Sequence, residues 1–190
     1  FRYRHRVTQN DLSLFTQTRD LPRLHFGVTG SSGLVGSQLV AMLVSQGHRV
    51  TKLIRSTKAN SVADGTNTLL WNPTEPLAPE VLSEIDVLVH LAGDSVAEGR
   101  WSRKKKQRIR ESRTIPTRLL AVSYGKSRGD RGIFLCASAV GYYGDRKEED
   151  LVEESTSGND FLSGVVRDWE AATNPARDQG TRVANLRFGV

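Results

Sequence analysis

Apolar residues along this chain of 190 residues alternate between short, nearly continuous runs and longer stretches with helical spacing. Short runs rich in β-branched and aromatic residues favour strands, whereas apolar residues three and four positions apart favour amphipathic helices. Strands are predicted, in chain order, at 24–30, 48–55, 67–71, 86–93, 132–139 and 181–189. Helices are predicted at 33–47, at about 101–125 and within 159–180. Pro116 lies inside the second helix and should kink or restart it, because proline lacks a backbone N–H.

The order of these segments predicts the fold class. Strands that alternate with helices at this spacing form right-handed βαβ units around a parallel sheet. The segment 86–93 is apolar almost throughout, as expected of a strand buried on both faces. We therefore predict an α/β fold with a doubly wound parallel sheet (Rossmann) over residues 24–190. Residues 1–23 have weak periodicity and are predicted to be a linker or the tail of a preceding domain.

Composition narrows the class of protein. Hydrophobic residues make up 37% and charged residues 25% of the chain, which is typical of globular domains. Cys136 is the only cysteine, so a disulfide framework is excluded and a reducing, cytoplasmic location is favoured. No apolar stretch is long enough to span a membrane. The chain starts at Phe1 and stops at Val190 directly after an apolar run, from which we expect a segment of a longer protein.

The net charge of +6 is unevenly distributed, and residues 99–113 carry most of the excess. One interpretation is a strip that binds a polyanion such as a nucleic acid. The other is a solvated helix beside an anionic cofactor site. The second is preferred, because the aromatic interleaving of single-strand binders is missing. We therefore predict a small-molecule substrate and neither a nucleic-acid nor a membrane partner.

The glycines of "VTGSSGLVG" lie between the first predicted strand and the first predicted helix, where a mononucleotide-binding fold has its phosphate turn. Gly30 suits the tight turn, Gly33 lets a pyrophosphate approach the backbone, and Gly36 lets the helix pack close to the sheet. Free amides at the helix N-terminus then face the phosphates. The alternative is a structural turn without a ligand.

The second predicted strand ends in a basic segment. NAD-selective sites usually have an acid here, but this chain has Arg55, followed by Ser56 and, nearby, Lys58. Arginine pairs well with a 2′-phosphate, so NADP is favoured over NAD as the cofactor. The alternative is a basic loop that faces solvent.

Eight short motifs follow one another along the chain. They are "VTGSSGLVG", "VHLAG", "GRW", "ESRTIPT", "SAVGYYG", "DFL", "DWEAA" and "LRFGV". Together they resemble the NAD(P)-binding epimerase-family proteins of the extended, atypical short-chain dehydrogenase/reductase superfamily, described as sugar-nucleotide epimerase-like or cell-division-inhibitor-like. The resemblance covers about residues 24–190. "FRYRH" and "NDL" resemble the end of a polyketide-cyclase-like lipid-binding domain that precedes the epimerase-like domain in some bacterial members.

The resemblance implies roles for residues around a cofactor. It implies a pyrophosphate turn at Gly30, Ser32, Gly33, Leu34, Val35 and Gly36, and a 2′-phosphate contact at Arg55 with Ser56. It also implies a wall along the adenosine side and middle of the cofactor at Leu91, Ala92 and Gly93. Arg113 would lie near the nicotinamide ribose, and Gly189 with Val190 would lie at the nicotinamide end. His90 invites a catalytic interpretation, but it falls within a buried strand, and a core histidine with its hydrogen bonds satisfied is preferred.

Typical members of this superfamily use a serine after the fifth strand together with Tyr-x-x-x-Lys on the next helix. Ser138 matches the serine. The helix reads "DFLSGVVRDWE", with Phe161 or Leu162 at the tyrosine place and Val165 or Val166 at the lysine place, so the pair is missing from it. An apolar side chain cannot carry a proton, so the usual mechanism is not available there.

Two hypotheses remain for the tyrosines that follow Ser138. Tyr142 or Tyr143 could act as the proton donor, with Ser138 or Arg113 lowering its pKa. Alternatively, both rings pack beneath the loop, which is the preferred interpretation. The acidic segment 148–155 has no metal-ligand spacing and is predicted to be a solvated loop, so no metal is predicted.

The sequence thus predicts an NADP(H)-binding oxidoreductase or epimerase-like protein that acts on a small or nucleotide-linked substrate. The alternative is a catalytically weak or inactive nicotinamide-binding protein that serves as a redox sensor or regulator. A nucleic-acid-binding module that uses residues 99–113 is a third, weaker hypothesis.

Overall fold

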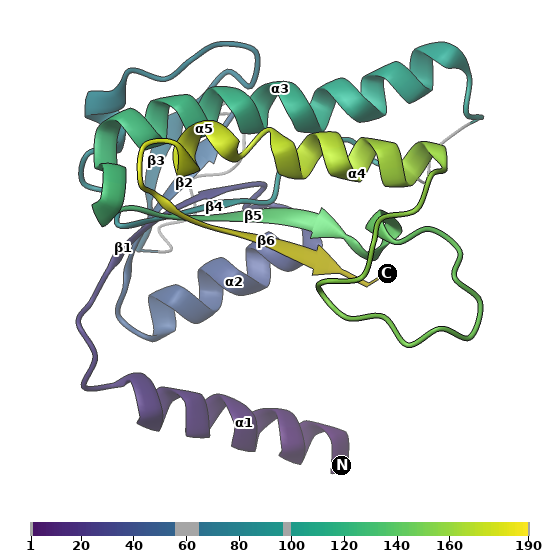
Figure 1. Cartoon of the computed structure of the whole chain (residues 1–190). Helices are drawn as coiled ribbons and strands as arrows, with labels where there is room; N and C mark the ends of the chain where they lie inside the picture. Colours follow the sequence, from purple (N-terminus) through teal and green to yellow (C-terminus); the bar gives the residue numbers. More distant parts are fainter. Residues whose placement is uncertain (1, 56–64, 97–99, 190) are drawn as a thin grey trace.

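The computed structural model describes residues 2–55, 65–96 and 100–189 (Figure 1). Its strands are β1 (His25–Thr29), β2 (Arg49–Ile54), β3 (Asn67–Leu70), β4 (Val87–His90), β5 (Ile133–Ala139) and β6 (Arg182–Phe188). They form one parallel sheet in the order β3-β2-β1-β4-β5-β6. The chain crosses from β3 back to β4 beside β1, so the strand order reverses between β1 and β4. The predicted doubly wound α/β fold is confirmed.

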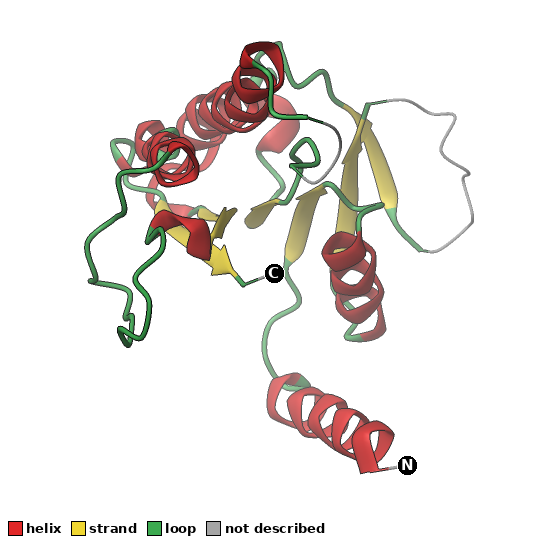
Figure 2. Ribbon diagram, turned by 90° about the vertical axis from the view of Figure 1, so that its right-hand side faces the viewer, coloured by secondary structure: helices red, strands yellow, loops and turns green. Residues whose placement is uncertain are grey.

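Helices cover both faces of this sheet. The helices of the described residues are α1 (Arg2–Thr18), α2 (Leu34–Ser45), α3 (Arg103–Arg128), α4 (Phe161–Ala171) and α5 (Asn174–Arg177), with short 3₁₀ turns η1 (Pro79–Leu82), η2 (Gly129–Arg131) and η3 (Val140–Tyr142). Helix α2 lies on one face, and α3, α4 and α5 lie on the other (Figures 1 and 2). The carboxyl ends of the strands point to the right in Figure 1, where α3 begins.

Strand β4 separates two apolar clusters. All four of its residues are buried, as its continuous apolar character predicts. Val87 and Val89 pack in the cluster under α2, whereas Leu88 packs in the cluster under α3 and α4. The alternation follows from the period of two in a strand, which sends successive side chains to opposite faces.

Helix α3 differs from the prediction at Pro116, because it continues through this residue without a restart. Pro116 itself is buried. The turns that follow it place Leu120, Ala121 and Tyr124 in the core against the sheet. This packing holds the helix on both sides of the proline, where local propensity alone favoured a break.

The C-terminal helical segment also differs in detail. The helix predicted within 159–180 is divided into α4 and α5, and Pro175 lies at the start of α5, where its missing N–H is tolerated. The weakly periodic N-terminal segment forms the 17-residue helix α1, which stands apart from the sheet in Figures 1 and 2. Its large apolar side chains Val7, Leu12 and Phe15 are exposed. Its assignment as a linker or tail stays a prediction.

Among the residues that the structure describes, none of the helices combines the length and the apolar character needed to cross a bilayer.

Candidate functional site

The glycine turn joins β1 to α2 at the point where the strand order reverses. Gly30 has a φ of 65°, in the left-handed region that favours glycine. A Cβ atom on Gly30 would lie 2.8 Å from the carbonyl carbon of Leu91 and 2.9 Å from the amide nitrogen of Ala92. A Cβ atom on Gly36 would overlap the carbonyl oxygen of Gly30. Only glycine fits at these two positions, so the turn and the residues after β4 are in direct backbone contact.

The N-terminus of α2 opens from this turn. Gly33 is its N-cap residue and supplies no side-chain cap to the first amides. Ser32, Leu34 and Val35 are all exposed around it. Uncapped amides at a helix N-terminus, together with the helix dipole, form a favourable place for a phosphate group. The residues predicted for the pyrophosphate turn therefore lie together in an open, electropositive turn.

The segment after β4 forms the second wall of the candidate cofactor site, and the glycine turn forms the first. The backbone amides of Leu91 and Ala92 both donate to Thr29 Oγ1, over 3.1 and 3.3 Å. Gly93 faces Arg113, whose guanidinium carbon would lie 3.6 Å from a Cβ atom on Gly93. Leu91 to Gly93 and Arg113 are thus brought together.

Arg113 is held by protein groups on several sides. Its Nη2 donates to the carbonyl oxygen of Asp94 over 2.9 Å, and its Nη1 donates to that of Ile109 over 3.0 Å. Its guanidinium also lies over the ring of Trp169, 5.2 Å from the centroid. The side chain is therefore fixed at the base of the wall, and its predicted contact with the nicotinamide ribose stays a prediction.

Three predicted cofactor residues lie at or beyond the limits of the described structure. Arg55 directly follows β2 and is exposed. Ser56 and Val190 lie outside the described residues, as does Lys58. The 2′-phosphate contact and the nicotinamide end therefore remain predictions.

Ser138, the serine of the resemblance, is buried at the end of β5. Its side chain is 3% exposed, and its hydroxyl donates to Glu170 Oε1 over 2.5 Å. Glu170 also accepts from Arg187, through Nε to Oε1 over 2.9 Å and Nη2 to Oε2 over 3.0 Å. Parallel pairing sets Ser138 directly beside Arg187 in neighbouring strands. The serine proton is thus held by a carboxylate of α4.

The same arginine reaches the tyrosine pair. Arg187 Nη1 donates to the hydroxyl of Tyr143 over 2.8 Å and to the carbonyl oxygen of Glu153 over 3.0 Å. Its guanidinium stacks on Tyr142, 3.6 Å from the ring centroid. Hydrogen bonds to Glu170 raise the pKa of Arg187 further above its already high value. The arginine therefore stays charged and points a permanent donor at the Tyr143 oxygen.

Tyr143 itself is 7% exposed, so the ring packs beneath the loop as the preferred interpretation held. Tyr143 nevertheless lines a cavity of about 660 Å³, together with Glu170, Asn185 and Arg187. Within the described part of the chain, no acceptor lies against the proton of this hydroxyl. A phenol that accepts from a cation and keeps its own proton free is suited to proton donation.

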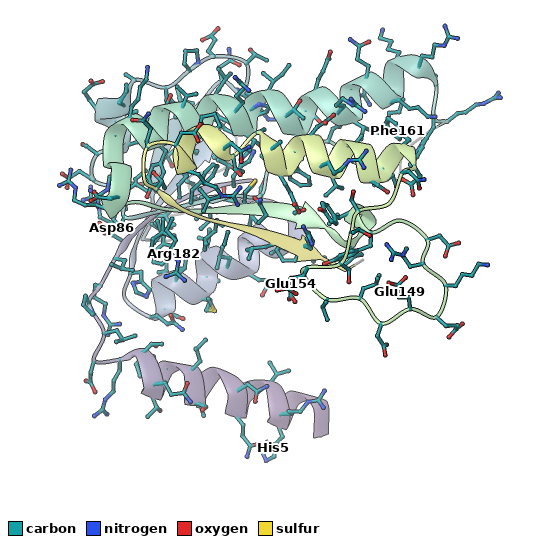
Figure 3. The ribbon with its side chains drawn as sticks, in the orientation of Figure 1. His5, Asp86, Glu149, Glu154, Phe161 and Arg182 are labelled. Atoms are coloured by element: carbon teal, nitrogen blue, oxygen red, sulfur yellow. The ribbon has the colours of Figure 1, made fainter. Side chains whose placement is uncertain are left out.

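Residues at the usual tyrosine and lysine places cannot transfer a proton. Val165 and Val166 are 2% and 5% exposed and belong to the core. Phe161, at the start of α4, packs its ring against Trp101 at 5.8 Å between centroids and under Lys106 Nζ at 4.9 Å. Figure 3 shows Phe161 at the opposite end of the sheet from Asp86, which precedes β4.

The spacing Tyr-x-x-x-Lys does occur in the chain, at Tyr143 and Lys147. These residues do not lie on a helix, because η3 ends at Tyr142 and Lys147 has a φ of 54° in an exposed turn. Residues four apart share a face only in a helix. This pair therefore does not reproduce the arrangement of the superfamily.

His90 is fully buried at the end of β4, in agreement with the core interpretation, but the expectation that its hydrogen bonds are all satisfied is not met among the described residues. Burial lowers its pKa to about 3, so the ring is neutral at physiological pH. Its Nδ1 lies 2.7 Å from Thr29 Oγ1, but its Nε2 has no hydrogen-bond partner among the described residues.

Two arginines of the basic segment form ion pairs with carboxylates from other parts of the chain. In the basic segment, Arg108 pairs with Asp94 at 2.7 Å, and Arg110 pairs with Asp168 at 2.7 Å. The acidic segment 148–155 lies on a long exposed loop, on which Figure 3 labels Glu149 and Glu154. Across the described ranges, no group of three His, Cys, Asp or Glu side chains could hold a metal ion.

Glu170 and Arg187 were missed as candidate residues. The available signals were an acid beside the buried Trp169, in "DWEAA", and an arginine between two apolar residues, in "LRFGV". Charges in such positions are rarely buried unless paired. Their partnership depends on the packing of α4 over β6, which local sequence does not reveal.

Comparison with known proteins agrees with this arrangement. The model of the NAD dependent epimerase/dehydratase family matches residues 27–164. Epimerase family protein Mb2239 of Mycobacterium bovis is 40% identical over 166 residues, which are 86% of this chain and 52% of that protein. This chain spans about half the length of such relatives.

Solved structures give the same result. The nucleoside-diphosphate sugar epimerase from Corynebacterium glutamicum is similar with a TM-score of 0.78 and 43% identity, over 95% of this chain and 38% of that one. Human epimerase family protein SDR39U1 (isoform 2), solved with NADPH, has a TM-score of 0.70 and 27% identity, over 88% of this chain and 54% of that one. The resemblance seen in the sequence is confirmed, and this chain belongs to the NAD dependent epimerase/dehydratase family.

Proposed function

We propose that this chain binds a nicotinamide dinucleotide, preferring NADP(H), within an oxidoreductase or epimerase-like enzyme that acts on a small or nucleotide-linked substrate. The observation that carries the proposal is the uncapped N-terminus of α2 behind Gly30 and Gly36, at the strand reversal between β1 and β4. Open α/β sheets bind dinucleotides at this reversal. The NADPH in the SDR39U1 structure supports the choice of ligand.

The preference for NADP(H) rests on Arg55. This exposed arginine follows β2, where NAD-selective sites have an acid. A planar guanidinium can bind a phosphate through two hydrogen bonds, whereas a ribose hydroxyl offers no charge. Arg55 thus favours the cofactor that carries a 2′-phosphate.

Proton transfer is assigned to Tyr143. When bound, the nicotinamide would supply or accept the hydride. In the direction of carbonyl reduction, the Tyr143 hydroxyl would deliver its proton to the substrate oxygen, and in the direction of alcohol oxidation its phenolate would take that proton back. The charged Arg187, 2.8 Å away, would stabilise the phenolate in both directions. Ser138 acts in this scheme through Glu170, which holds Arg187 in place.

Fluorescence titration with NADPH tests cofactor binding, since the chain has three tryptophans. Binding should be lost in Gly33→Val, because a side chain there would crowd the phosphate turn. Gly164→Ala is the matched control, since a Cβ atom on that helical glycine meets only flexible arginine tips at 3.7 Å. Normal NADPH binding by Gly33→Val would refute the site.

Turnover separates an enzyme from a sensor. NADPH consumption is measured over a panel of carbonyl substrates, including nucleotide-linked sugars. The alternative of a nicotinamide-binding regulator rests on the apolar residues at the usual tyrosine and lysine places. Tight NADPH binding without turnover of any substrate would select that alternative.

A further inference from the structure

The hydrogen bonds around Thr29 determine which nitrogen of His90 carries the proton. Thr29 Oγ1 receives the amide protons of Leu91 and Ala92, which occupy both of its lone pairs. Its own proton must then go to His90 Nδ1, 2.7 Å away. His90 Nδ1 is therefore an acceptor, and the ring proton lies on Nε2.

The Nε2 proton points into an apolar cluster. It has no hydrogen-bond partner among the described residues, and the ring is fully buried. The rings of Trp71 and His90 are nearly perpendicular, at 85°, with centroids 5.9 Å apart. An edge-to-face arrangement of this kind offers an N–H group a weak π acceptor. A buried N–H group without a hydrogen bond lowers the free energy of unfolding, so its retention here suggests a role for the ring elsewhere in the site.

This role concerns the backbone contact between the glycine turn and the segment after β4, which are the two walls of the candidate cofactor site. Gly30 lies so close to Leu91 and Ala92 that a Cβ atom there would come within 2.9 Å of their backbone. Thr29, the residue before Gly30, is the side chain that binds both amides of this second wall. The orientation of its hydroxyl therefore sets how the wall sits against the glycine turn.

We infer that His90 is a positioning residue for the dinucleotide site, acting through the Thr29 hydroxyl to hold Leu91–Gly93 against the glycine turn. The inference rests on the proposed cofactor binding. Only a neutral His90 ring without a proton on Nδ1 can accept a hydrogen bond from the Thr29 hydroxyl. Both lone pairs of Thr29 Oγ1 then remain available to the amides of Leu91 and Ala92. Burial, which keeps the pKa of His90 low, maintains this state.

A second histidine–threonine pair in the same sheet provides a matched control. His25 Nε2 lies 2.8 Å from Thr51 Oγ1, and His25 Nδ1 lies 2.8 Å from the carbonyl oxygen of Glu84. Both side chains are buried, as in the first pair. His25 begins β1, whereas Thr29 ends it. The control pair therefore has the same chemistry at the amino end of β1, away from the glycine turn.

The test measures NADPH affinity and the free energy of unfolding for matched variants. Thr29→Val should weaken NADPH binding about tenfold, because the wall loses its shared acceptor. Thr29→Ser, which keeps the hydroxyl, and Thr51→Val, which breaks only the control pair, should stay within about twofold of the parent. If Thr29→Val and Thr51→Val both lose stability and neither loses affinity, the inference is overturned.

Substitution of His90 gives a second, independent readout. His90→Asn presents an amide oxygen close to the place of Nδ1 and should bind NADPH more tightly than His90→Phe, which offers no acceptor. This comparison also decides the matter if Thr29→Val fails to fold. Equal affinity in the two His90 variants would contradict the inference.

Nitrogen NMR of the histidine rings separates this inference from the proposed function. Parent protein should show Nδ1 without a proton and Nε2 with one, and Thr29→Val should lose this tautomer preference. Failure of the parent to bind NADPH would refute the proposed function even with the tautomer present. A parent that binds NADPH with the proton on Nδ1 would overturn the positioning role alone.

Discussion

Arg187 and Glu170 form a bidentate ion pair between strand β6 and helix α4, with nitrogen–oxygen distances of 2.9 and 3.0 Å. Their side chains are 19% and 14% exposed. The pair joins Ser138 on β5 to Tyr143 after η3. Four residues from three parts of the chain thus share one hydrogen-bond network beside the cavity.

Removal of the Glu170 charge should destabilise the protein. In Glu170→Gln the guanidinium of Arg187 loses its counter-charge while it stays largely buried, which should cost about 2–3 kcal/mol of unfolding free energy. Denaturant titration measures the loss. Glu149→Gln is the control, because Glu149 also pairs with an arginine, Arg146, but its side chain is 47% exposed to solvent. This substitution should cost less than about 0.5 kcal/mol of unfolding free energy. Equal losses in the two variants would contradict a special role for the Glu170 pair.

Tyr143→Phe should abolish turnover and leave NADPH affinity unchanged. The substitution removes the hydroxyl that accepts from Arg187 and keeps the buried ring. Tyr142→Phe is the matched control, because Tyr142 contributes its ring face to Arg187 and should retain activity. Steady-state kinetics of both variants make the comparison. Full activity of Tyr143→Phe would assign proton donation to another group.

Arg55→Ala should weaken NADPH binding about tenfold or more and leave NADH binding nearly unchanged, because only NADPH carries the 2′-phosphate. Titration of each variant with both cofactors tests this. Arg49→Ala provides the control, since this exposed arginine lies at the opposite end of β2. If both cofactors lose affinity equally in Arg55→Ala, the arginine does not read the 2′-phosphate.

Stability should fall as the pH is lowered, and His90 should account for about one proton of the dependence. The folded protein keeps His90 neutral down to about pH 3, whereas the unfolded chain protonates it below its ordinary pKa of 6.5. Protonation therefore stabilises the unfolded state between these values. The slope contributed by His90 should be about 1.4 kcal/mol per pH unit between about pH 5.5 and about pH 4.

Comparison with His90→Asn isolates the contribution of His90 to this pH dependence. The comparison is needed because His25 and His48 also have lowered pKa values and add slopes of the same sign. Unfolding free energies are measured across the acid range for parent and variant. Parallel pH profiles for the two proteins would show that His90 does not titrate as its burial requires.

The local sequence pattern was sufficient to predict the strands of the sheet and the glycine turn. Short apolar runs, helical spacing and the positions of Gly30, Gly33 and Gly36 are properties of neighbouring residues, and they predicted the parallel sheet and the phosphate turn. Local propensity was insufficient at Pro116, where core packing of α3 outweighed the cost of a missing hydrogen bond. It was also insufficient in α1, which is helical despite weak periodicity.

The sequence by itself determined the fold class, the place of the glycine turn and the lack of a Tyr-x-x-x-Lys pair on helix α4. Tertiary structure alone decided that the Ser138 hydroxyl donates a hydrogen bond to Glu170 and that Arg187 donates one to Tyr143. It likewise decided that Thr29 ties His90 to the wall after β4. These partners lie 32, 44 and 61 positions apart in the chain. Only strand order and register bring them within hydrogen-bonding distance, because a hydrogen bond depends on geometry that no local pattern encodes.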